Sequence, residues 1–190
     1  MFKLVVLVSG GGTNLQAIID AIESGKLLAK IDLVVADREC YGLERAKSAN
    51  IPTKLIDRKI YKDKLSEELT QSISSDCDLV VMAGFLSIIR QDFVRKFENK
   101  IINLHPSLLP KFGGIGMWGM NVHKAVINAR EKFSGCTVHY VTEEVDGGNI
   151  IEQAVVEILP TETYESLQKK IAVEEHKLIV SVIDKLSRGI

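Results

Sequence analysis

Two runs of consecutive apolar residues constrain the fold more than any other feature of this sequence. Leu4–Val8 and Leu79–Ala83 contain no polar side chain. A strand that faces water on one side alternates polar and apolar residues. An uninterrupted apolar run is instead typical of a strand that is covered on both faces, as in a parallel sheet. The sequence therefore predicts a parallel sheet between layers of helices.

Short apolar runs alternate with amphipathic segments over the first hundred residues, and this order favours a doubly wound α/β fold with a mostly parallel sheet. Such sheets bind ligands at the carboxyl ends of their strands. We expect strands at Lys3–Val8, Asp32–Ala36, Thr53–Ile56, Leu79–Ala83 and Lys100–Leu104, and helices at Asn14–Glu23, Gly42–Ala49, Tyr61–Ser74 and Arg90–Phe97.

The pattern changes after Pro110. Residues 111–121 hold four glycines and predict a mobile surface loop, and a helix is expected near Val122–Arg130. Cys136–Val141 and Ile150–Ile158 predict an antiparallel pair of strands at the sheet edge, and residues 163–187 predict a long C-terminal helix. We find no linker or repeat, so we expect one domain over residues 1–190.

Composition excludes several classes of protein. The net charge of −1 gives no general affinity for nucleic acid or an anionic membrane. No stretch approaches the roughly 18 apolar residues that span a bilayer. The three cysteines are scattered and form no CxxC pair, so we expect no metal site, and reduced thiols fit a cytoplasmic protein. The N-terminal apolar run is too short for an export signal.

A glycine-rich segment follows the first expected strand. Residues 9–14 read Ser-Gly-Gly-Gly-Thr-Asn, and either Thr13 or Asn14 would be a good N-cap for the next helix. Glycines let the backbone approach a ligand closely, and free N–H groups at a helix N-terminus favour anions. The segment therefore predicts a phosphate site, with a tight turn that binds nothing as the alternative.

The same loop matches the dinucleotide fingerprint GxGxxG only in part. Gly10 and Gly12 fit, and Asp37 follows the second strand roughly where a ribose-binding acid is expected, but position 15 is a leucine. A P-loop is excluded because no Gly-Lys-Ser or Gly-Lys-Thr follows the glycines. An NAD(P)-dependent oxidoreductase is one alternative hypothesis, and a non-catalytic nucleotide-binding module is another.

Asn103 and His105 lie two residues apart, directly before Pro106, at the end of the fifth expected strand. Side chains at i and i+2 of a strand project from the same face, and a proline, which lacks an N–H group, ends the strand. An amide donor beside an imidazole suits polarising a carbonyl group and moving a proton. The alternative is that both side chains only satisfy the backbone of a loop.

Two carboxylates and an apolar segment complete the candidate site. Asp146 lies in a Val-Asp-Gly-Gly segment, and near His105 it would raise the pKa of the imidazole and keep it charged; a hairpin turn without a role in the site is the alternative. His139 could line the same cleft. Glu175 falls on the apolar stripe of the terminal helix, where a carboxylate is costly unless a cation or ligand hydroxyl groups bind it, with a partly exposed glutamate at the edge of the stripe as the alternative. Residues 83–89 would let a planar apolar ligand lie at a strand end, with ordinary core packing as the alternative.

Together, residues 9–16, Asn103–Pro110 and residues 145–148 resemble the phosphoribosylglycinamide (GAR) formyltransferases, a folate-dependent family of purine synthesis. The resemblance extends from Lys3 to about Ile183. It implies a Rossmann-like formyltransferase fold and transfer of a formyl group from 10-formyltetrahydrofolate, as co-substrate, to the amine of GAR without a metal ion. The implied partners are these small molecules, and a homodimer stays open.

The resemblance also implies a role for each matching residue. Asn103 and a protonated His105 would stabilise the oxyanion that forms when the GAR amine attacks the formyl carbon, and Asp146 would hold and charge His105. The GAR phosphate and ribose would lie on Gly12, Thr13, Asn14 and Glu175. The folate would lie on Arg58, Leu86, Ser87, Ile88, Ile89 and Asn103.

Two features depart from the family. Ser87 stands where many relatives have arginine, and the loop Phe112–Asn121 is longer than usual and has Gly113 in place of a proline. Within the family, a formyltetrahydrofolate hydrolase is the alternative. Those enzymes usually carry an additional N-terminal domain, so we favour transfer to GAR.

Overall fold

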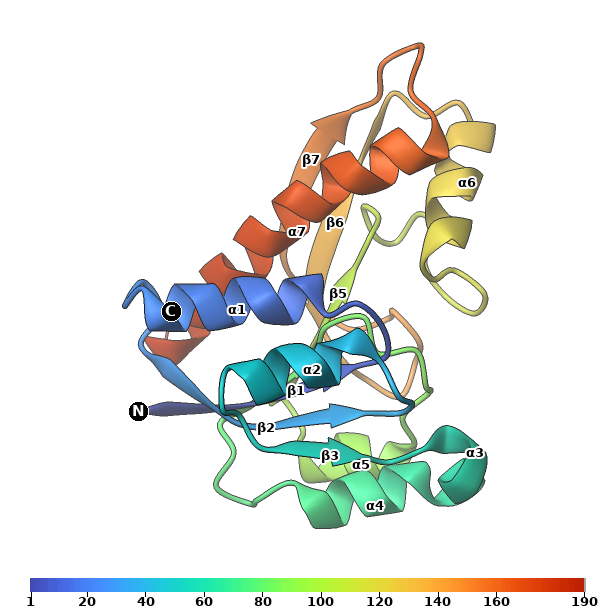
Figure 1. The fold of residues 1–190 in the computed structure, drawn as a ribbon. Helices are drawn as coiled ribbons and strands as arrows, with labels where there is room; N and C mark the ends of the chain where they lie inside the picture. Colours follow the sequence, from blue (N-terminus) through green and yellow to red (C-terminus); the bar gives the residue numbers. More distant parts are fainter. Residues whose placement is uncertain (190) are drawn as a thin grey trace.

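The computed structural model describes residues 1–189, in which seven strands form one sheet (Figure 1). The strands are β1 (Phe2–Val8), β2 (Ala29–Ala36), β3 (Thr53–Leu55), β4 (Leu79–Met82), β5 (Ile101–His105), β6 (Phe133–Tyr140) and β7 (Ile150–Glu157). Their order is β3-β2-β1-β4-β5-β6-β7. Strands β1 to β5 pair in parallel, whereas β5–β6 and β6–β7 are antiparallel. The predicted sheet with an antiparallel edge is confirmed.

Helices connect and cover these strands. They are α1 (Thr13–Glu23), α2 (Tyr41–Ser48), α3 (Arg58–Tyr61), the 3₁₀ helix η1 (Lys62–Lys64), α4 (Leu65–Ser72), α5 (Gln91–Lys96), α6 (Met120–Asn128) and α7 (Tyr164–Ser187). The long α7 starts at a capping box between Thr163 and Ser166 and runs along β6 and β7 to reach α1 (Figure 1). Within residues 1–189, no helix is both long and apolar enough to cross a membrane.

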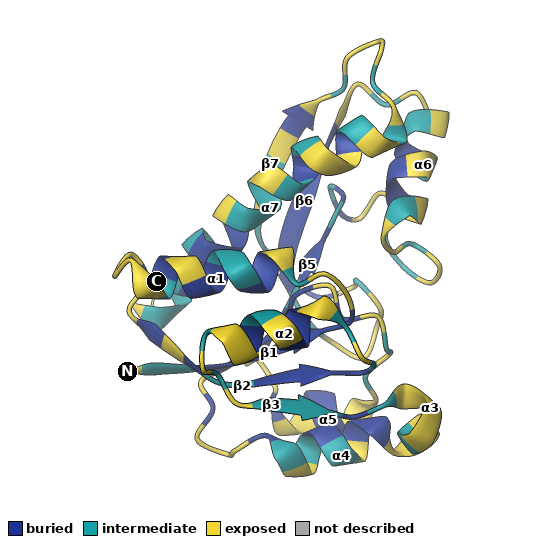
Figure 2. Ribbon diagram, viewed as in Figure 1, coloured by how far each residue is buried: buried dark blue, intermediate teal, exposed yellow. Residues whose placement is uncertain are grey.

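The apolar runs are buried from both sides, as their sequence predicts. In β1, Leu4, Val6 and Val8 pack into one core with α1, α2 and α7, whereas Val5 and Leu7 pack into a second core with α4 and α5. Each large aliphatic side chain removed from water contributes about 1.5–3 kcal/mol. This two-sided burial fixes the sheet as the central layer (Figure 2).

Two helix boundaries differ from the prediction. Gly12 is the N-cap of α1 and no side chain caps the helix, so the expected cap at Thr13 or Asn14 is wrong. The chain enters α1 through a left-handed residue (φ 68°), which glycine adopts without strain. The single helix expected at Tyr61–Ser74 is divided into α3, η1 and α4, because Lys62 has a φ of 45° that a continuous α-helix does not allow.

The parallel strands place their carboxyl ends at one edge of the sheet. The segments that follow β1, β2, β4 and β5 therefore meet there, and the turn between β6 and β7 reaches the same region (Figure 1). Pro106 follows His105, the last residue of β5, as expected. The loop after β5 contains no regular secondary structure until Met120. This edge is where the sequence places every candidate site residue except Glu175.

Candidate active site

A cavity of about 910 Å³ opens at this edge of the sheet. Its lining comes from the glycine loop, α7, the segment after β4, the end of β5, and the loops 114–119 and 141–146. The predicted site residues that line it are Gly12, Thr13, Asn14, Leu86, Ser87, Ile88, Ile89, Asn103, His105, Asp146 and Glu175.

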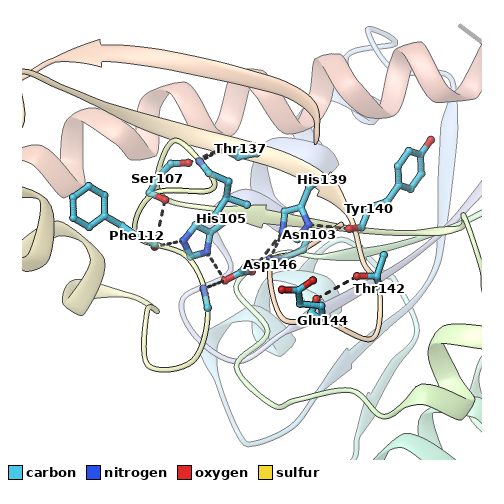
Figure 3. A network of polar contacts seen from close by, with 12 residues as sticks. Asn103, His105, Ser107, Phe112, Thr137, His139, Tyr140, Thr142, Glu144 and Asp146 are labelled. Carbon is cyan, nitrogen blue, oxygen red and sulfur yellow. Dashed lines mark hydrogen bonds and ion pairs between the residues drawn. The ribbon is translucent and has the colours of Figure 1, made fainter. Parts of the chain in front are cut away.

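Asp146 is the centre of the polar network in this cavity (Figure 3). Its Oδ1 accepts a hydrogen bond from Asn103 Nδ2 (3.5 Å) and lies 3.5 Å from His139 Nε2. Its Oδ2 accepts from the Gly114 N–H (2.9 Å) and lies 3.5 Å from His105 Nδ1. The structure therefore brings together the three residues expected to act in catalysis and adds His139 to them.

Backbone carbonyl groups fix the direction of both imidazoles. His105 Nε2 lies 2.8 Å from the carbonyl oxygen of Phe112, so this nitrogen carries a proton and donates it. His139 Nδ1 lies 2.8 Å from the carbonyl oxygen of Tyr140 and donates in the same way. His139 Nε2 can then accept from Asn103 Nδ2, which is 3.1 Å away. His105 thus presents Nδ1, and not Nε2, to Asp146.

Burial decides the charge of His105. The side chain is 4% exposed, and desolvation lowers its pKa below the ordinary value even though Asp146 and the Phe112 carbonyl group oppose the shift. The expectation of a charged His105 is therefore wrong for this structure, because the loss of hydration outweighs the carboxylate. Burial alone would raise the pKa of Asp146, but the neighbouring imidazoles of His139 and His105 and the hydrogen bond from the Gly114 N–H lower it, so Asp146 is ionised.

The turn after β5 supports His105 through the carbonyl group of Phe112. Ser107 Oγ donates to the carbonyl oxygen of Lys111 (2.7 Å), and Thr137 Oγ1 donates to that of Ser107 (2.6 Å). Phe112, whose carbonyl group accepts from His105, has a φ of 56°. A non-glycine residue at positive φ costs about 1–3 kcal/mol, and surrounding contacts must maintain it. The turn is therefore a rigid support for the imidazole.

The glycine loop is held close to α2. Gly42 N–H donates to the carbonyl oxygen of Gly10 (3.0 Å), and Arg45 Nε donates to that of Gly11 (2.7 Å). A Cβ atom on Gly12 would lie 2.7 Å from Gly42 Cα, whereas one on Gly10 or Gly11 would meet nothing within 4 Å. Close packing thus requires glycine at position 12, and the open side of the other glycines faces the cavity. This geometry suits a phosphate group beside the N-terminus of α1.

Glu175 lies beside the glycine loop, as the apolar-stripe argument anticipates. Its Oε2 accepts from Asn14 Nδ2 at 3.3 Å, and burial raises the pKa of the carboxyl group above its usual range. One long hydrogen bond leaves this carboxylate short of partners. Ligand hydroxyl groups next to Asn14 would supply the missing donors.

The cavity segment at residues 86–89 is hydrogen-bonded to a buried carboxylate, that of Asp37. Ser87 Oγ donates to Asp37 Oδ2 (2.5 Å), and Arg38 binds both oxygens of Asp37 at 2.9 Å. Because Asp37 is 0% exposed, its carboxylate is not available to a ribose, and the main support for a dinucleotide site is lost. Leu86 N–H donates to Ser9 Oγ (2.8 Å), which fixes the start of the segment that lines the cavity.

Several cavity residues were not predicted, among them His123 and Lys169, and one predicted residue lies elsewhere. Arg58 is exposed on α3 and does not line the cavity. His123 on α6 lines it, is 3% exposed, and has no partner for Nδ1 within residues 1–189; burial lowers its pKa to about 4. Lys169 on α7 lines it as well. A single histidine or lysine on an amphipathic helix belongs to no sequence motif, so the sequence gives no signal that it lines a cavity.

Comparison with known proteins assigns the chain. The model of the formyl transferase family matches residues 2–183. The chain belongs to the formyl transferase family. The phosphoribosylglycinamide formyltransferase of Haemophilus influenzae is 41% identical over 195 aligned residues, which cover 100% of this chain and 89% of that protein. The crystal structure of glycinamide ribonucleotide transformylase 1 from Symbiobacterium toebii superposes with a TM-score of 0.93 at 37% identity, and it covers 100% of this chain and 89% of that one.

This formyl transferase also matches part of longer proteins. It is 38% identical to the bovine trifunctional purine biosynthetic protein adenosine-3 over 98% of its own length, but it spans only 18% of that protein. The family and the Rossmann-like fold expected from the sequence are confirmed. The roles of single residues are matters of geometry and are argued below.

Proposed function

We propose that this formyl transferase moves the formyl group of 10-formyltetrahydrofolate to the amine of GAR, giving formyl-GAR and tetrahydrofolate. One observation carries the proposal. The Asp146 network lines the same cavity as a phosphate-type glycine loop and an apolar wall formed by residues 86–89. A phosphorylated amine and a folate that bind in this cavity could therefore both reach the network.

The neutral state of His105 gives it a role as proton acceptor. The GAR nitrogen attacks the formyl carbon, and the amine proton passes to His105 Nδ1, the ring nitrogen that faces Asp146. The imidazolium is then stabilised by the ionised Asp146, which lies 3.5 Å away. When the bond between the formyl carbon and N10 of the folate breaks, the same proton moves to N10, and atoms and charge balance.

Asn103 is placed to stabilise the tetrahedral intermediate. Its Nδ2 points towards the network, where it contacts His139 and Asp146 (Figure 3). The formyl oxygen becomes an oxyanion during attack, and an amide donor aimed at it contributes most when the charge develops. Asn103 would exchange one of its present acceptors for this oxygen.

We place the remaining contacts on residues that line the cavity. The GAR phosphate lies on the backbone of Gly12, Thr13 and Asn14, and Glu175 accepts from the ribose hydroxyl groups. The folate ring lies on Leu86, Ser87, Ile88 and Ile89. Because Ser87 Oγ is bound to Asp37, position 87 contacts folate through its backbone. Arg58, outside the cavity, can reach only the carboxylate end of the folate.

The proposal includes no metal ion, a cytoplasmic location and either a monomer or a homodimer. Within residues 1–189, no three His, Cys, Asp or Glu side chains are grouped so that they could hold a metal. The three cysteines of the chain are all free thiols, as a reducing compartment requires.

A formyltetrahydrofolate hydrolase is the second candidate, because the same network could activate water in place of the amine. Purified protein, treated with a chelator, is mixed with 10-formyltetrahydrofolate with and without GAR. Appearance of formyl-GAR, seen by mass spectrometry and dependent on GAR, supports transfer. Release of tetrahydrofolate at the same rate without GAR would refute transfer and establish hydrolysis.

A further inference from the structure

His123 is a buried histidine of the cavity that has no part in the transfer steps. It lies on α6, is 3% exposed and lines the cavity. Its neighbours on the buried face of the helix, Val122 and Val126, are fully buried and belong to the core that α7 shares. Helix α6 also packs beside α7 (Figure 1). This packing holds the imidazole against the cavity.

The imidazole of His123 lacks polar partners in the protein. Its Nδ1 atom is sealed from solvent and forms no hydrogen bond within residues 1–189. The other ring nitrogen, Nε2, is not among the sealed atoms, and no group in the described part of the chain bonds to it. A buried polar side chain without a partner is unfavourable, so a group of this kind indicates a partner that binds from outside the chain.

The surroundings of the ring decide which nitrogen carries the proton. Burial lowers the pKa of His123 to about 4, so the ring is neutral and has one N–H group. With the proton on Nδ1, a sealed N–H group would have no acceptor, and orphaned buried N–H groups are rarer than unpaired acceptors. The proton is therefore on Nε2, and His123 presents a neutral hydrogen-bond donor to the cavity.

This donor lies near the group that accepts the amine proton. The charge of His105 is a second cause of the low pKa of His123, which places the two imidazoles within electrostatic range of each other. The amine of GAR must approach His105 Nδ1 to react. One methylene carbon separates that amine from the glycinamide carbonyl group, so the carbonyl oxygen must lie in the same part of the cavity.

We propose that His123 Nε2 donates a hydrogen bond to the glycinamide carbonyl oxygen of GAR and so selects an amine substrate that carries an amide. The inference rests on the proposed function, because it requires GAR in this cavity. Bound GAR supplies the acceptor that the imidazole lacks, and the imidazole replaces the water that hydrates the carbonyl oxygen in solution. A neutral donor suits this place, since a cation beside His105 would oppose protonation of His105.

The contact should act on binding and not on the chemical step. It is made equally in the bound substrate and in the transition state, so its loss raises KM for GAR and leaves kcat nearly unchanged. A donor that is removed leaves a buried carbonyl oxygen unpaired, which weakens binding by roughly 5- to 100-fold. KM for 10-formyltetrahydrofolate should stay the same, because the folate does not touch His123.

The test compares His123→Leu with His123→Gln in steady-state kinetics and in calorimetric titration with GAR. Leucine has a similar volume and no donor, whereas the amide nitrogen of glutamine can take nearly the place of Nε2 and donate. His123→Leu should raise KM and Kd for GAR by about 10-fold or more, and His123→Gln by less than about threefold. An equal rise in both variants overturns the proposal.

Val126→Ala is the matched control, because Val126 is fully buried on the same helix and does not line the cavity. It should lower stability and leave KM and Kd for GAR unchanged. A thioamide analogue of GAR, in which sulfur replaces the carbonyl oxygen, is a second control, since sulfur is a weaker acceptor. The analogue should bind wild-type protein and His123→Leu with nearly equal affinity. A rise in KM for Val126→Ala as large as that for His123→Leu would show a general loosening of α6 and overturn the proposal.

Nitrogen NMR of the wild-type protein, with labelled histidine, tests the donor even if His123→Leu fails to fold. The His123 resonances are assigned by their absence from the spectrum of His123→Gln. Nε2 should carry the proton, and this proton should shift when GAR is added. A proton on Nδ1, or an Nε2 proton that saturating GAR leaves unchanged, overturns the proposal.

Further outcomes separate this inference from the proposed function. A fall in kcat at constant KM would place His123 on the reacting atoms and overturn the carbonyl contact. Formyl transfer to GAR with equal kinetics in the wild-type protein and His123→Leu would refute the contact alone. Binding of GAR that depends on His123, without formyl transfer by the wild-type protein, would support the contact and refute the proposed function.

Discussion

Acidification should destabilise this protein through His123, a buried histidine that lines the cavity. The folded-state pKa is about 4, and the ordinary value is 6.5. A histidine whose folded pKa lies below its unfolded pKa stays neutral in the fold while it is protonated in the unfolded chain. Stability is therefore lost as pH falls below 6.5, and the loss is complete below about pH 4. Linkage between these two values gives about 2 kcal/mol at pH 5.

The substitution His123→Gln removes the titrating group and keeps a polar side chain. Urea unfolding, followed by circular dichroism, would be measured at about pH 7.5 and about pH 5 for the wild-type protein and the variant. Relative to the wild type, the variant should gain roughly 2 kcal/mol in the free energy of unfolding at the lower pH. His176, whose pKa burial also lowers, contributes equally to both proteins and cancels. The charge of His105 is a second cause of the low pKa of His123, so its effect belongs to the measured difference.

Val126→Ala is the matched control. Val126 lies on the same helix, α6, and is fully buried, but it does not titrate. Its substitution should lower stability by about 1–3 kcal/mol at both pH values alike. If the difference between His123→Gln and the wild type were the same at pH 7.5 and pH 5, the assignment of a neutral, buried His123 would be refuted.

The remaining predictions concern the reaction. Asn103→Ala should lower kcat by roughly 10²–10³ with little change in KM, and a loss below threefold in steady-state assays would remove it from catalysis. Gly12→Ala should raise KM for GAR and lower stability by about 1–3 kcal/mol, because the new Cβ meets Gly42 and φ is positive; Gly10→Ala, whose Cβ would meet no atom within 4 Å, should leave stability unchanged in the same unfolding measurements. In a pH–rate profile, kcat/KM should fall on the acid side, below pH 6.5, because His105 must be neutral. Asp146→Asn should move that limb to lower pH, since the carboxylate raises the pKa of the imidazole, and a shift to higher pH would contradict this coupling.

The sheet was predictable because its signal is local and strong. The uninterrupted apolar runs at β1 and β4 require cover on both faces, and the structure supplies two cores that share β1. The antiparallel edge was predictable from the turn signal between β6 and β7. The break at Lys62 was not, because a positive φ at a lysine leaves no mark in hydrophobic periodicity.

The site was predictable in its composition but not in its charge state. Asn103, His105 and Asp146 converge as expected, since strand periodicity and the turn signal place them at one edge. The sign of the pKa shift at His105 depends on how far burial outweighs Asp146, and burial is a property of the whole fold. His123 was missed for a similar reason: only tertiary packing brings α6 to the cavity.

Two networks support the lining of the cavity. Arg45 and Gly42 bind the glycine loop through its carbonyl oxygens. Asp37 accepts a hydrogen bond from the hydroxyl group of Ser87 in the wall. The proposed substrate contacts use other atoms, namely the N–H groups of the loop and the backbone of Ser87.

The central claim is that two substrates meet at Asp146 within one cavity. A crystal structure with GAR and an unreactive analogue of 10-formyltetrahydrofolate tests it most directly. We predict the phosphate on the backbone of Gly12–Asn14, the folate ring on Leu86–Ile89, and the amine about 3–3.5 Å from the carbon that stands for the formyl group. Asn103 and His105 should lie within hydrogen-bonding distance of the reacting atoms. A phosphate bound away from the glycine loop, or reacting atoms remote from Asp146, would contradict the account.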